Sequence, residues 1–342
     1  MIRAYIEPSG ESPALARAES VAATEALGGR PATERLLEVP DLIEVDVPDL
    51  PSAGNLAQRL ALARRALLLR SRSEEIGPYL EGEGRSGSTA AVRRFKRPSS
   101  GGDDAGVRAA GRSYTSGGGR IDLVRPDRRF WLARATDGTD VLLEEVASVD
   151  RRASAARRMP SLPFQRPVSL PPRYARAAAN LARIRPGDRV VDPFVGTGAL
   201  LAEAGLLGAR LYGIDRDPEM VRGTLRNLAH LGVGAEELVV GDAGEVEFAD
   251  RAAAFDAVLT DPPYGRASST GGEGHAAVVE RVLPRWAARV RPGGRLVVVV
   301  PGPTLDPGPG WRPVAAASIR VHRSLTREFR AYERDAVTTR SE

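Results

Sequence analysis

Five short apolar runs, separated by segments with helical periodicity, constrain how the second half of this chain can fold. The runs lie at residues 189–192, 210–215, 237–240, 255–260 and 295–301. Near-continuous apolar strands are typical of parallel sheets that helices cover on both faces. The sequence therefore predicts an α/β fold with a doubly wound, Rossmann-like sheet.

Helices are expected between these runs, and an antiparallel hairpin after them. The expected helices lie at residues 173–184, 198–207, 218–231, 243–248 and 275–290. Residues 315–322 and 326–333 read as two strands around a short connection. This pattern predicts an antiparallel hairpin that closes the sheet.

The first half of the chain is organised differently and predicts a smaller α+β region. Residues 1–70 follow a strand–helix–strand–helix order, with the second helix expected at 53–69. Residues 71–148 include Gly-, Ser- and Arg-rich stretches, and residues 149–172 form a Pro- and Arg-rich segment typical of a linker. We expect the domain with the parallel sheet to occupy residues 173–342.

Composition narrows the classes of function. The chain has 342 residues, a formal net charge of +5 at pH 7 and no cysteine. The lack of cysteine excludes a disulfide scaffold, a cysteine nucleophile and thiolate metal sites. We find no apolar run of membrane-spanning length and no signal-peptide pattern at the start. We therefore expect a cytoplasmic protein with no membrane partner. We also expect a monomer whose chemistry needs no metal, although composition does not determine either.

Carboxylates stand at the carboxyl ends of successive predicted strands. Asp192 opens a glycine-containing loop, Asp215 ends the next strand, and Asp242 follows the third. Strand ends of a parallel sheet meet at one edge, so these groups should form one ligand site. A dinucleotide fold would place a pyrophosphate at the first loop, where Asp192 would oppose it. A carboxylate there suits a cationic ligand such as S-adenosylmethionine, which carries an ammonium and a sulfonium.

Each part of this predicted site has an expected task. Glycines let a ligand approach the backbone. The carboxylate of Asp215 can accept hydrogen bonds from ribose hydroxyls, and Asp242 is expected near the adenine amino group. The predicted cofactor-binding residues are Asp192, Phe194, Gly196, Thr197, Gly198, Asp215, Arg216, Asp242 and Ala243.

The tetrapeptide Asp261-Pro262-Pro263-Tyr264 follows the fourth strand and predicts a catalytic site for a planar amino group. Asp261 and the backbone carbonyl of Pro262 can each accept one N–H, and the ring of Tyr264 can stack on the attached base. The alternative is a strand end followed by a proline turn, with Tyr264 packed in the core.

Basic and aromatic side chains alternate within residues 71–148. The predicted RNA-binding residues are Arg93, Arg94, Lys96, Arg97, Arg128 and Arg129. Such a mixture is typical of nucleic-acid-binding faces. A solvated sheet edge, which Arg and Lys also protect, explains it equally well.

Residues 160–333 resemble the archaeal THUMP-domain tRNA guanine-N2 methyltransferases and their eukaryotic relatives. The matching segments are 163–170 (PFQRPVSL), 192–198 (DPFVGTG), 213–218 (GIDRDP), 261–266 (DPPYGR) and 320–327 (RVHRSLTR). Val195 stands where the family often has cysteine, and Ala199 where it often has glycine. The N-terminal half is a weaker match, in which residues 1–70 resemble a ferredoxin-like unit and residues 71–148 a THUMP-like region.

The resemblance implies a class I enzyme that uses S-adenosylmethionine to methylate guanosine N2 at tRNA position ten, once or twice. Its partner would be tRNA. The competing hypotheses are methylation of another tRNA guanine, of an rRNA guanine or of the N6 of DNA adenine, and an RNA-binding protein without catalysis. A dehydrogenase is disfavoured by Asp192 and by the missing third glycine of the dinucleotide motif.

Overall fold

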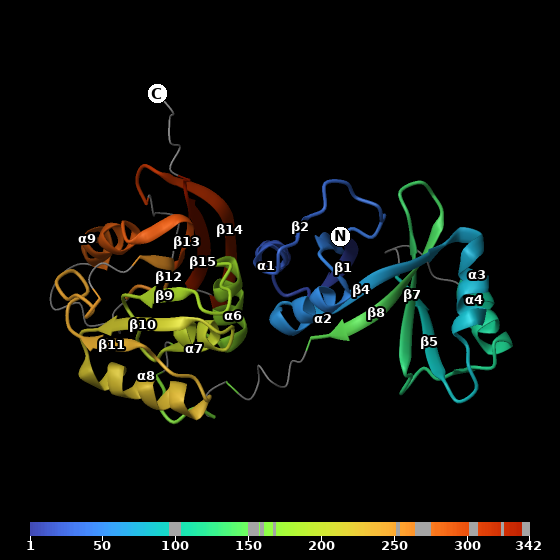
Figure 1. Cartoon of the computed structure of the whole chain (residues 1–342), viewed down its shortest axis with the longest axis horizontal. Coiled ribbons are helices and arrows are strands. Elements are labelled where there is room, and N and C mark those ends of the chain that lie inside the picture. Colours follow the sequence, from blue (N-terminus) through green and yellow to red (C-terminus); the bar gives the residue numbers. More distant parts are fainter. Residues whose placement is uncertain are drawn as a thin grey trace. The chain divides into compact units, whose positions relative to one another are not determined.

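The computed structural model (Figure 1) describes residues 1–95, 104–149, 157, 161–166, 169–250, 254–263, 275–300, 307–322 and 325–336. The chain divides into two compact units. The first comprises Met1–Ser9, Leu27–Gln58 and Ala63–Val149, and the second Gly10–Ala26, Arg59–Leu62 and Asp150–Glu342. Among the residues described, no helix is both long enough and apolar enough to cross a membrane.

The first unit is α+β and contains one sheet with the strand order β2-β3-β1-β4-β8-β7-β5-β6. Its strands are β1 (Ile2–Pro8), β2 (Arg30–Pro31), β3 (Ile43–Val47), β4 (Ala63–Arg72), β5 (Thr89–Arg94), β6 (Arg120–Ile121), β7 (Arg128–Arg134) and β8 (Asp140–Ser148). Its helical segments are α2 (Leu50–Arg59), η1 (Ser73–Glu75), α3 (Ile76–Glu83) and α4 (Ala105–Ser116). Leu80 of α3 and Tyr114 of α4 pack against Phe130 on the sheet.

Strand β4 corrects the helix predicted at residues 53–69. Helix α2 ends at Arg59, and the chain continues as β4 between β1 and β8. Ala66, Leu67 and Leu68 are consecutive buried residues, and a short apolar run does not distinguish an interior strand from a buried helix. One sheet runs across the expected boundary at residue 70. The division into ferredoxin-like and THUMP-like regions stays a prediction.

The second unit confirms the predicted doubly wound fold. Its strand order is β11-β10-β9-β12-β13-β15-β14. The strands are β9 (Arg189–Asp192), β10 (Arg210–Asp215), β11 (Glu237–Val240), β12 (Phe255–Thr260), β13 (Val290–Val300), β14 (Trp311–His322) and β15 (Leu325–Arg334). Strands β9 to β13 pair in parallel. Strand β15 pairs antiparallel with β13 and β14, as the predicted hairpin requires.

Helices cover both faces of this sheet (Figure 1). They are α1 (Pro13–Ala26), α6 (Pro172–Leu181), α7 (Ala199–Gly205), α8 (Pro218–His230) and α9 (His275–Ala287). Alternate residues of one strand serve opposite faces: Val190 packs in the cluster that contains α6 and α7, whereas Val191 packs with Trp286 of α9. The helix expected at residues 243–248 is wrong, because residues 243–245 form a turn and residues 246–248 have no regular secondary structure.

Candidate active site

The carboxyl edge of the parallel strands opens into one cavity. Register aligns the strand ends there, with Asp192 opposite Gly213 and Val191 opposite Val258. The cavity has a volume of about 660 Å³, within the usual range for small-molecule sites. It is lined by Arg166, Ser169, Leu170, Asp192, Pro193, Phe194, Val195, Gly196, Thr197, Ala199, Leu200, Asp215, Arg216, Asp217, Pro218, Met220, Gly241, Asp242, Ala243, Asp261, Pro262, Pro263, Val278, Arg281 and Arg327.

Asp192 is a buried carboxylate at the end of β9. Its Oδ1 accepts the hydroxyl of Thr260 at 2.6 Å and the backbone N–H of Phe194 at 3.0 Å. Burial raises the pKa of Asp192 to about 7, and the nearby charges of Asp261 and Asp215 act in the same direction. A cationic ligand group beside Asp192 would favour its ionised form and lower this pKa again.

The loop after β9 is shaped by Asp215 and by two glycines. Asp215 accepts the N–H of Gly196 on Oδ2 and that of Asp217 on Oδ1, both at 2.9 Å. Gly196 and Gly198 have φ values of 52° and 78°, where other residues are strained. A Cβ at Gly198 would lie 2.6 Å from Cγ2 of Thr224. Burial raises the pKa of Asp215, which stands at the cavity wall with its loop already ordered.

Asp242 is held by basic side chains from two elements. Arg281 of α9 donates to both carboxylate oxygens, at 3.0 and 3.1 Å, and Arg216 donates to Oδ2 at 2.8 Å. The N–H of Gly244 donates to Oδ1 at 2.7 Å. The hydrogen bonds from Arg281 are the main cause that holds the pKa of Asp242 below its usual range. The carboxylate is therefore ionised and fixed in orientation at the cavity wall.

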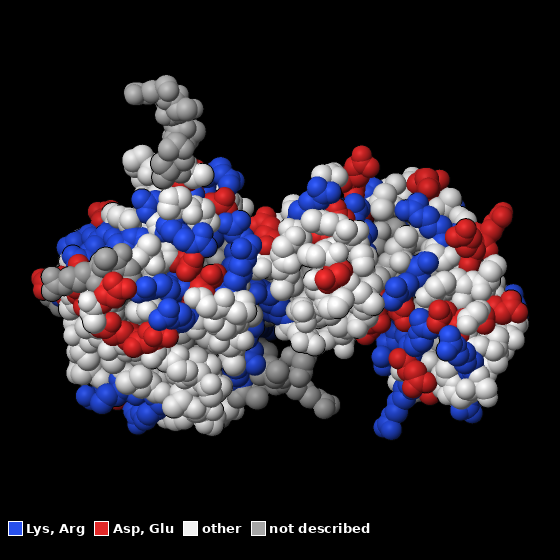
Figure 2. Space-filling view, viewed as in Figure 1, with Lys and Arg blue, Asp and Glu red and all other residues white. Residues whose placement is uncertain are grey.

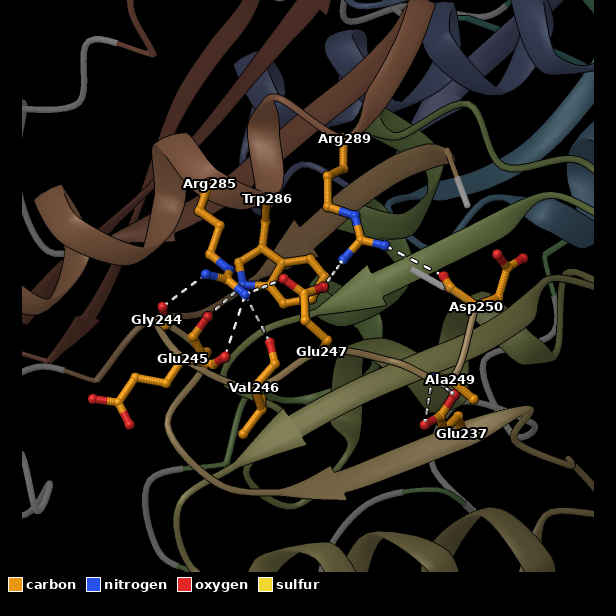
Figure 3. A network of polar contacts seen from close by, with 11 residues as sticks. Glu237, Gly244, Glu245, Val246, Glu247, Ala249, Asp250, Arg285, Trp286 and Arg289 are labelled. Carbon is orange, nitrogen blue, oxygen red and sulfur yellow. Dashed lines mark hydrogen bonds and ion pairs between the residues drawn. The ribbon is translucent and has the colours of Figure 1, made fainter. Parts of the chain in front are cut away.

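Two side chains of α9 hold the turn that carries Ala243. The buried Trp286 donates its indole N–H to the carbonyl of Ala243 at 2.9 Å. Arg285 donates to the carbonyls of Gly244 and Val246 at 2.9 and 3.0 Å (Figure 3). Side chains thus donate the hydrogen bonds that backbone N–H groups would donate in a helix. The carbonyls of this segment are satisfied without helical pairing.

Asp261 directly follows β12 and combines burial with an unsatisfied oxygen. Its Oδ1 is buried, and no described residue donates a hydrogen bond to it. Its Oδ2 lies 3.4 Å from Nη1 of Arg327. Burial raises the pKa of Asp261 to about 7, although the charge of Arg327 opposes that rise. An unpaired buried acceptor costs free energy, so Oδ1 is a natural place for an N–H of a ligand.

The cavity brings together most of the residues predicted for catalysis and cofactor binding. Gly198 is absent from its lining but is the N-cap of α7. Tyr264 lies outside the described residues. Sequence reasoning missed Arg281 and Arg327, which lie far along the chain from the motifs they contact. The four-residue spacing from Arg281 to Arg285 places both arginines on one face of a helix, and this was the signal available for Arg281. The roles of the individual site residues stay predictions.

Two of the predicted RNA-binding arginines are engaged with acidic side chains. Arg94 on β5 donates to Asp140 at 3.0 Å, and Arg128 on β7 donates to Glu144 at 2.7 Å. Figure 2 likewise shows acidic and basic side chains interspersed over the visible face of this unit. A phosphate at either arginine would have to compete with these carboxylates.

The remaining predicted RNA-binding residues are placed differently. Arg93 is exposed, and its guanidinium lies 5.8 Å from the ring centroid of Trp131. Arg129 is half-buried on β7, next to β5 in the sheet. Lys96 and Arg97 lie outside the described residues. An RNA-binding role for this face stays a prediction.

Comparison with known proteins gives a consistent set of matches. The model of a family described as "RMKL-like, methyltransferase domain" matches residues 161–304. The tRNA (guanine(10)-N2)-dimethyltransferase of Methanothermobacter thermautotrophicus is 35% identical over 222 residues, which cover 63% of this chain and 64% of that protein. The chain thus spans less than two thirds of that relative's length.

Two further matches differ in extent. A probable tRNA (guanine(10)-N2)-dimethyltransferase of Methanothermococcus thermolithotrophicus is 30% identical over 168 residues, 47% of this chain and 98% of that protein. The crystal structure of TrmN from Thermus thermophilus covers 97% of this chain and 99% of that one, at 22% identity and a TM-score of 0.49.

Proposed function

Because the chain belongs to the family of tRNA (guanine(10)-N2)-dimethyltransferases, we propose that it methylates the exocyclic N2 of guanosine in tRNA, at position ten, once or twice. The methyl donor would be S-adenosylmethionine. The observation that carries the proposal is the buried Oδ1 of Asp261, an acceptor without a described partner in a cavity lined by three further strand-end carboxylates.

The residues of the cavity fit such a donor. Asp192 would bind the cationic amino acid end, because an ammonium offsets the cost of a buried carboxylate. Asp215 would accept hydrogen bonds from the ribose hydroxyls. Asp242 and Ala243 would border the adenine. When bound, S-adenosylmethionine supplies an electrophilic methyl group on its sulfonium.

The protein's own task is to orient a weak nucleophile. The lone pair of the guanine amino group is delocalised into the ring. Asp261 and the Pro262 carbonyl would each accept one N–H, which draws the nitrogen toward a tetrahedral geometry. Such orientation is worth up to about 7–11 kcal/mol. The carboxylate of Asp261 would also stabilise the positive charge that develops on nitrogen.

The RNA side of the proposal rests on both halves of the chain. A base paired in a helix must leave its stack to reach a cavity of this kind, and Tyr264 would stack on it. We propose that residues 71–148 act as a THUMP-like RNA-binding region. Among the predicted RNA-binding residues that the structure describes, Arg93 is the exposed one, and its guanidinium lies beside the ring of Trp131.

The turn held by α9 gives a prediction about donor affinity. Arg285→Met removes the hydrogen bonds to Gly244 and Val246 and loosens the wall next to Ala243. We expect the Kd of S-adenosylhomocysteine, measured by calorimetry, to rise about ten-fold, with kcat at saturating donor unchanged.

Arg210→Met is the matched control for that variant. Arg210 begins β10 and pairs with the exposed Glu236, at the opposite end of the strand from Asp215. The control should keep the wild-type Kd. An unchanged Kd in a folded Arg285→Met protein would show that α9 does not set the adenine wall.

The function is tested with labelled S-adenosylmethionine and a panel of unmodified tRNA transcripts, rRNA fragments and DNA duplexes. We expect incorporation into tRNA, with N2-methylguanosine or N2,N2-dimethylguanosine as the product nucleoside. Incorporation into rRNA or DNA alone would agree with methyl transfer in the cavity but would refute our interpretation of residues 71–148. No incorporation into any substrate would refute the proposed activity.

A further inference from the structure

Arg327 reaches the catalytic edge because its strand runs against the others. Thr260, the last residue of β12, pairs with Val298 of β13, which pairs with Arg330 of β15. Since β15 is antiparallel to β13, its first residues lie at the carboxyl end of the parallel strands. Arg327 therefore stands at the level of Asp261 although 66 residues separate them in sequence.

The side chain of Arg327 is unusually buried for an arginine. It is 6% exposed, lines the cavity, and has its Nη1 3.4 Å from Oδ2 of Asp261. Arginine is almost never fully buried unless paired, because desolvating the guanidinium is costly. A buried cation beside a carboxylate favours the ionised form of that carboxylate.

We propose that Arg327 is a positioning residue that favours the ionised form of Asp261 and occupies its Oδ2 side, so that Oδ1 remains as the acceptor for the substrate amino group. This inference rests on the proposed function in assigning Oδ1 to a substrate. The ion pair itself is a property of the protein without substrate and can be tested apart from turnover.

Several other charged groups lie around Asp261. The charge of Asp261 contributes to the raised pKa of Asp192 on β9. Arg166, Asp215, Arg216 and Arg281 line the same cavity, and Asp242 binds Arg216 and Arg281. Among the described residues, Arg327 is the cation in ion-pair contact with Asp261. Burial raises the pKa of Asp261 to about 7 even with Arg327 in place.

The first test is the pH dependence of kcat/KM for the RNA between pH 6 and 9.5, because kcat/KM reports the pKa values of the free enzyme. In the wild type we expect the rate to fall on the acid side with an apparent pKa near 7. Arg327→Met should move this limb up by about 1–3 pH units, the usual effect of losing an opposite charge. Arg327→Lys should restore most of the wild-type limb. If Arg327→Met lowers kcat/KM by one factor at every pH, Arg327 contacts substrate or merely packs, and the proposal fails.

The second test needs no turnover, so it remains decisive if methyl transfer is not observed. Because the pKa of Asp261 is raised by folding from 3.8 to about 7, the acid stabilises the fold below about pH 4 and that contribution is lost as the pH rises through 7. The Asp261→Asn variant cannot ionise, so it keeps this stabilising contribution at every pH. The Tm gap between Asp261→Asn and its parent should therefore widen from about pH 4 upward and level off near pH 7.

The same gap is then measured in the Arg327→Met background. We expect the gap to keep widening to a pH above 8 before it levels off. A gap that still levels off near pH 7 would overturn the proposal whatever the catalytic result. If Arg327→Met does not fold, Arg327→Gln takes its place with the same expectation, since it also removes the charge.

Discussion

Asp261→Asn is expected to lower kcat for methyl transfer by roughly 10²–10³-fold, the usual cost of removing one preorganised group that stabilises transition-state charge. The amide has nearly the shape of the carboxylate but carries no negative charge. It would also turn one oxygen of Asp261 into a donor, either toward Arg327 or toward the substrate N–H. Orientation and charge stabilisation of the amino nitrogen would be lost together.

Donor binding separates this effect from general damage. The Kd of S-adenosylhomocysteine should stay within about two-fold of wild type, because Asp192, Asp215 and Asp242 are intact. Asp256→Asn is the control on the same strand: Asp256 lies near the start of β12, where it accepts the N–H of Arg189 at 2.7 Å. Near-normal turnover of Asp261→Asn would sink the mechanism.

Asp192→Asn is expected to stabilise the protein while it weakens donor binding. Both described hydrogen bonds of Asp192 end on Oδ1, from Thr260 and Phe194, so an amide oxygen can accept both. The pKa of Asp192 rises from 3.8 to about 7 on folding. The protonated acid therefore supports the fold below about pH 4, and this support disappears as the pH rises through 7. Asparagine never ionises and retains it.

The size of this effect follows from the shift. Three pKa units at 1.36 kcal/mol each give about 4 kcal/mol as an upper bound. Without ligand, the free energy of unfolding of Asp192→Asn should thus exceed that of the wild type at pH 8, and the two should differ little at pH 4. The Kd of S-adenosylhomocysteine should rise roughly ten- to hundred-fold, because the ligand's ammonium loses a charged partner. A variant with wild-type affinity and no pH-dependent gain would contradict the role given to Asp192.

Much of the second unit could be predicted from sequence, because an interior parallel strand must be apolar along its length. The runs at Phe255–Thr260 and Arg210–Asp215 are mostly apolar on both sides, so they show no polar face that water could contact. The run around Leu67 was ambiguous, because several consecutive apolar residues suit an interior strand or a buried helix. The turn after Asp242 was missed because Arg285 on α9, some 40 residues later in the chain, donates hydrogen bonds to its carbonyls.

The candidate site shows the same division. Carboxylates that follow successive predicted strands indicate in the sequence that they share one edge of the sheet. In the structure, Asp192, Asp215 and Asp261 line one cavity. Arg327 could not be predicted as their neighbour, because its place depends on how an antiparallel strand is registered against β13. Contacts that arise from register carry no local sequence signal.

The central claim is that the methylated atom is a guanine amino nitrogen, and replacing that atom tests it most directly. A tRNA transcript with guanosine at position ten is compared with one that carries inosine there, which lacks the N2 amino group and keeps the rest of the base. The account predicts methyl incorporation into the guanosine transcript and none at that position in the inosine transcript, with similar affinity for both. Equal incorporation into the two would place the methyl group elsewhere and contradict the account.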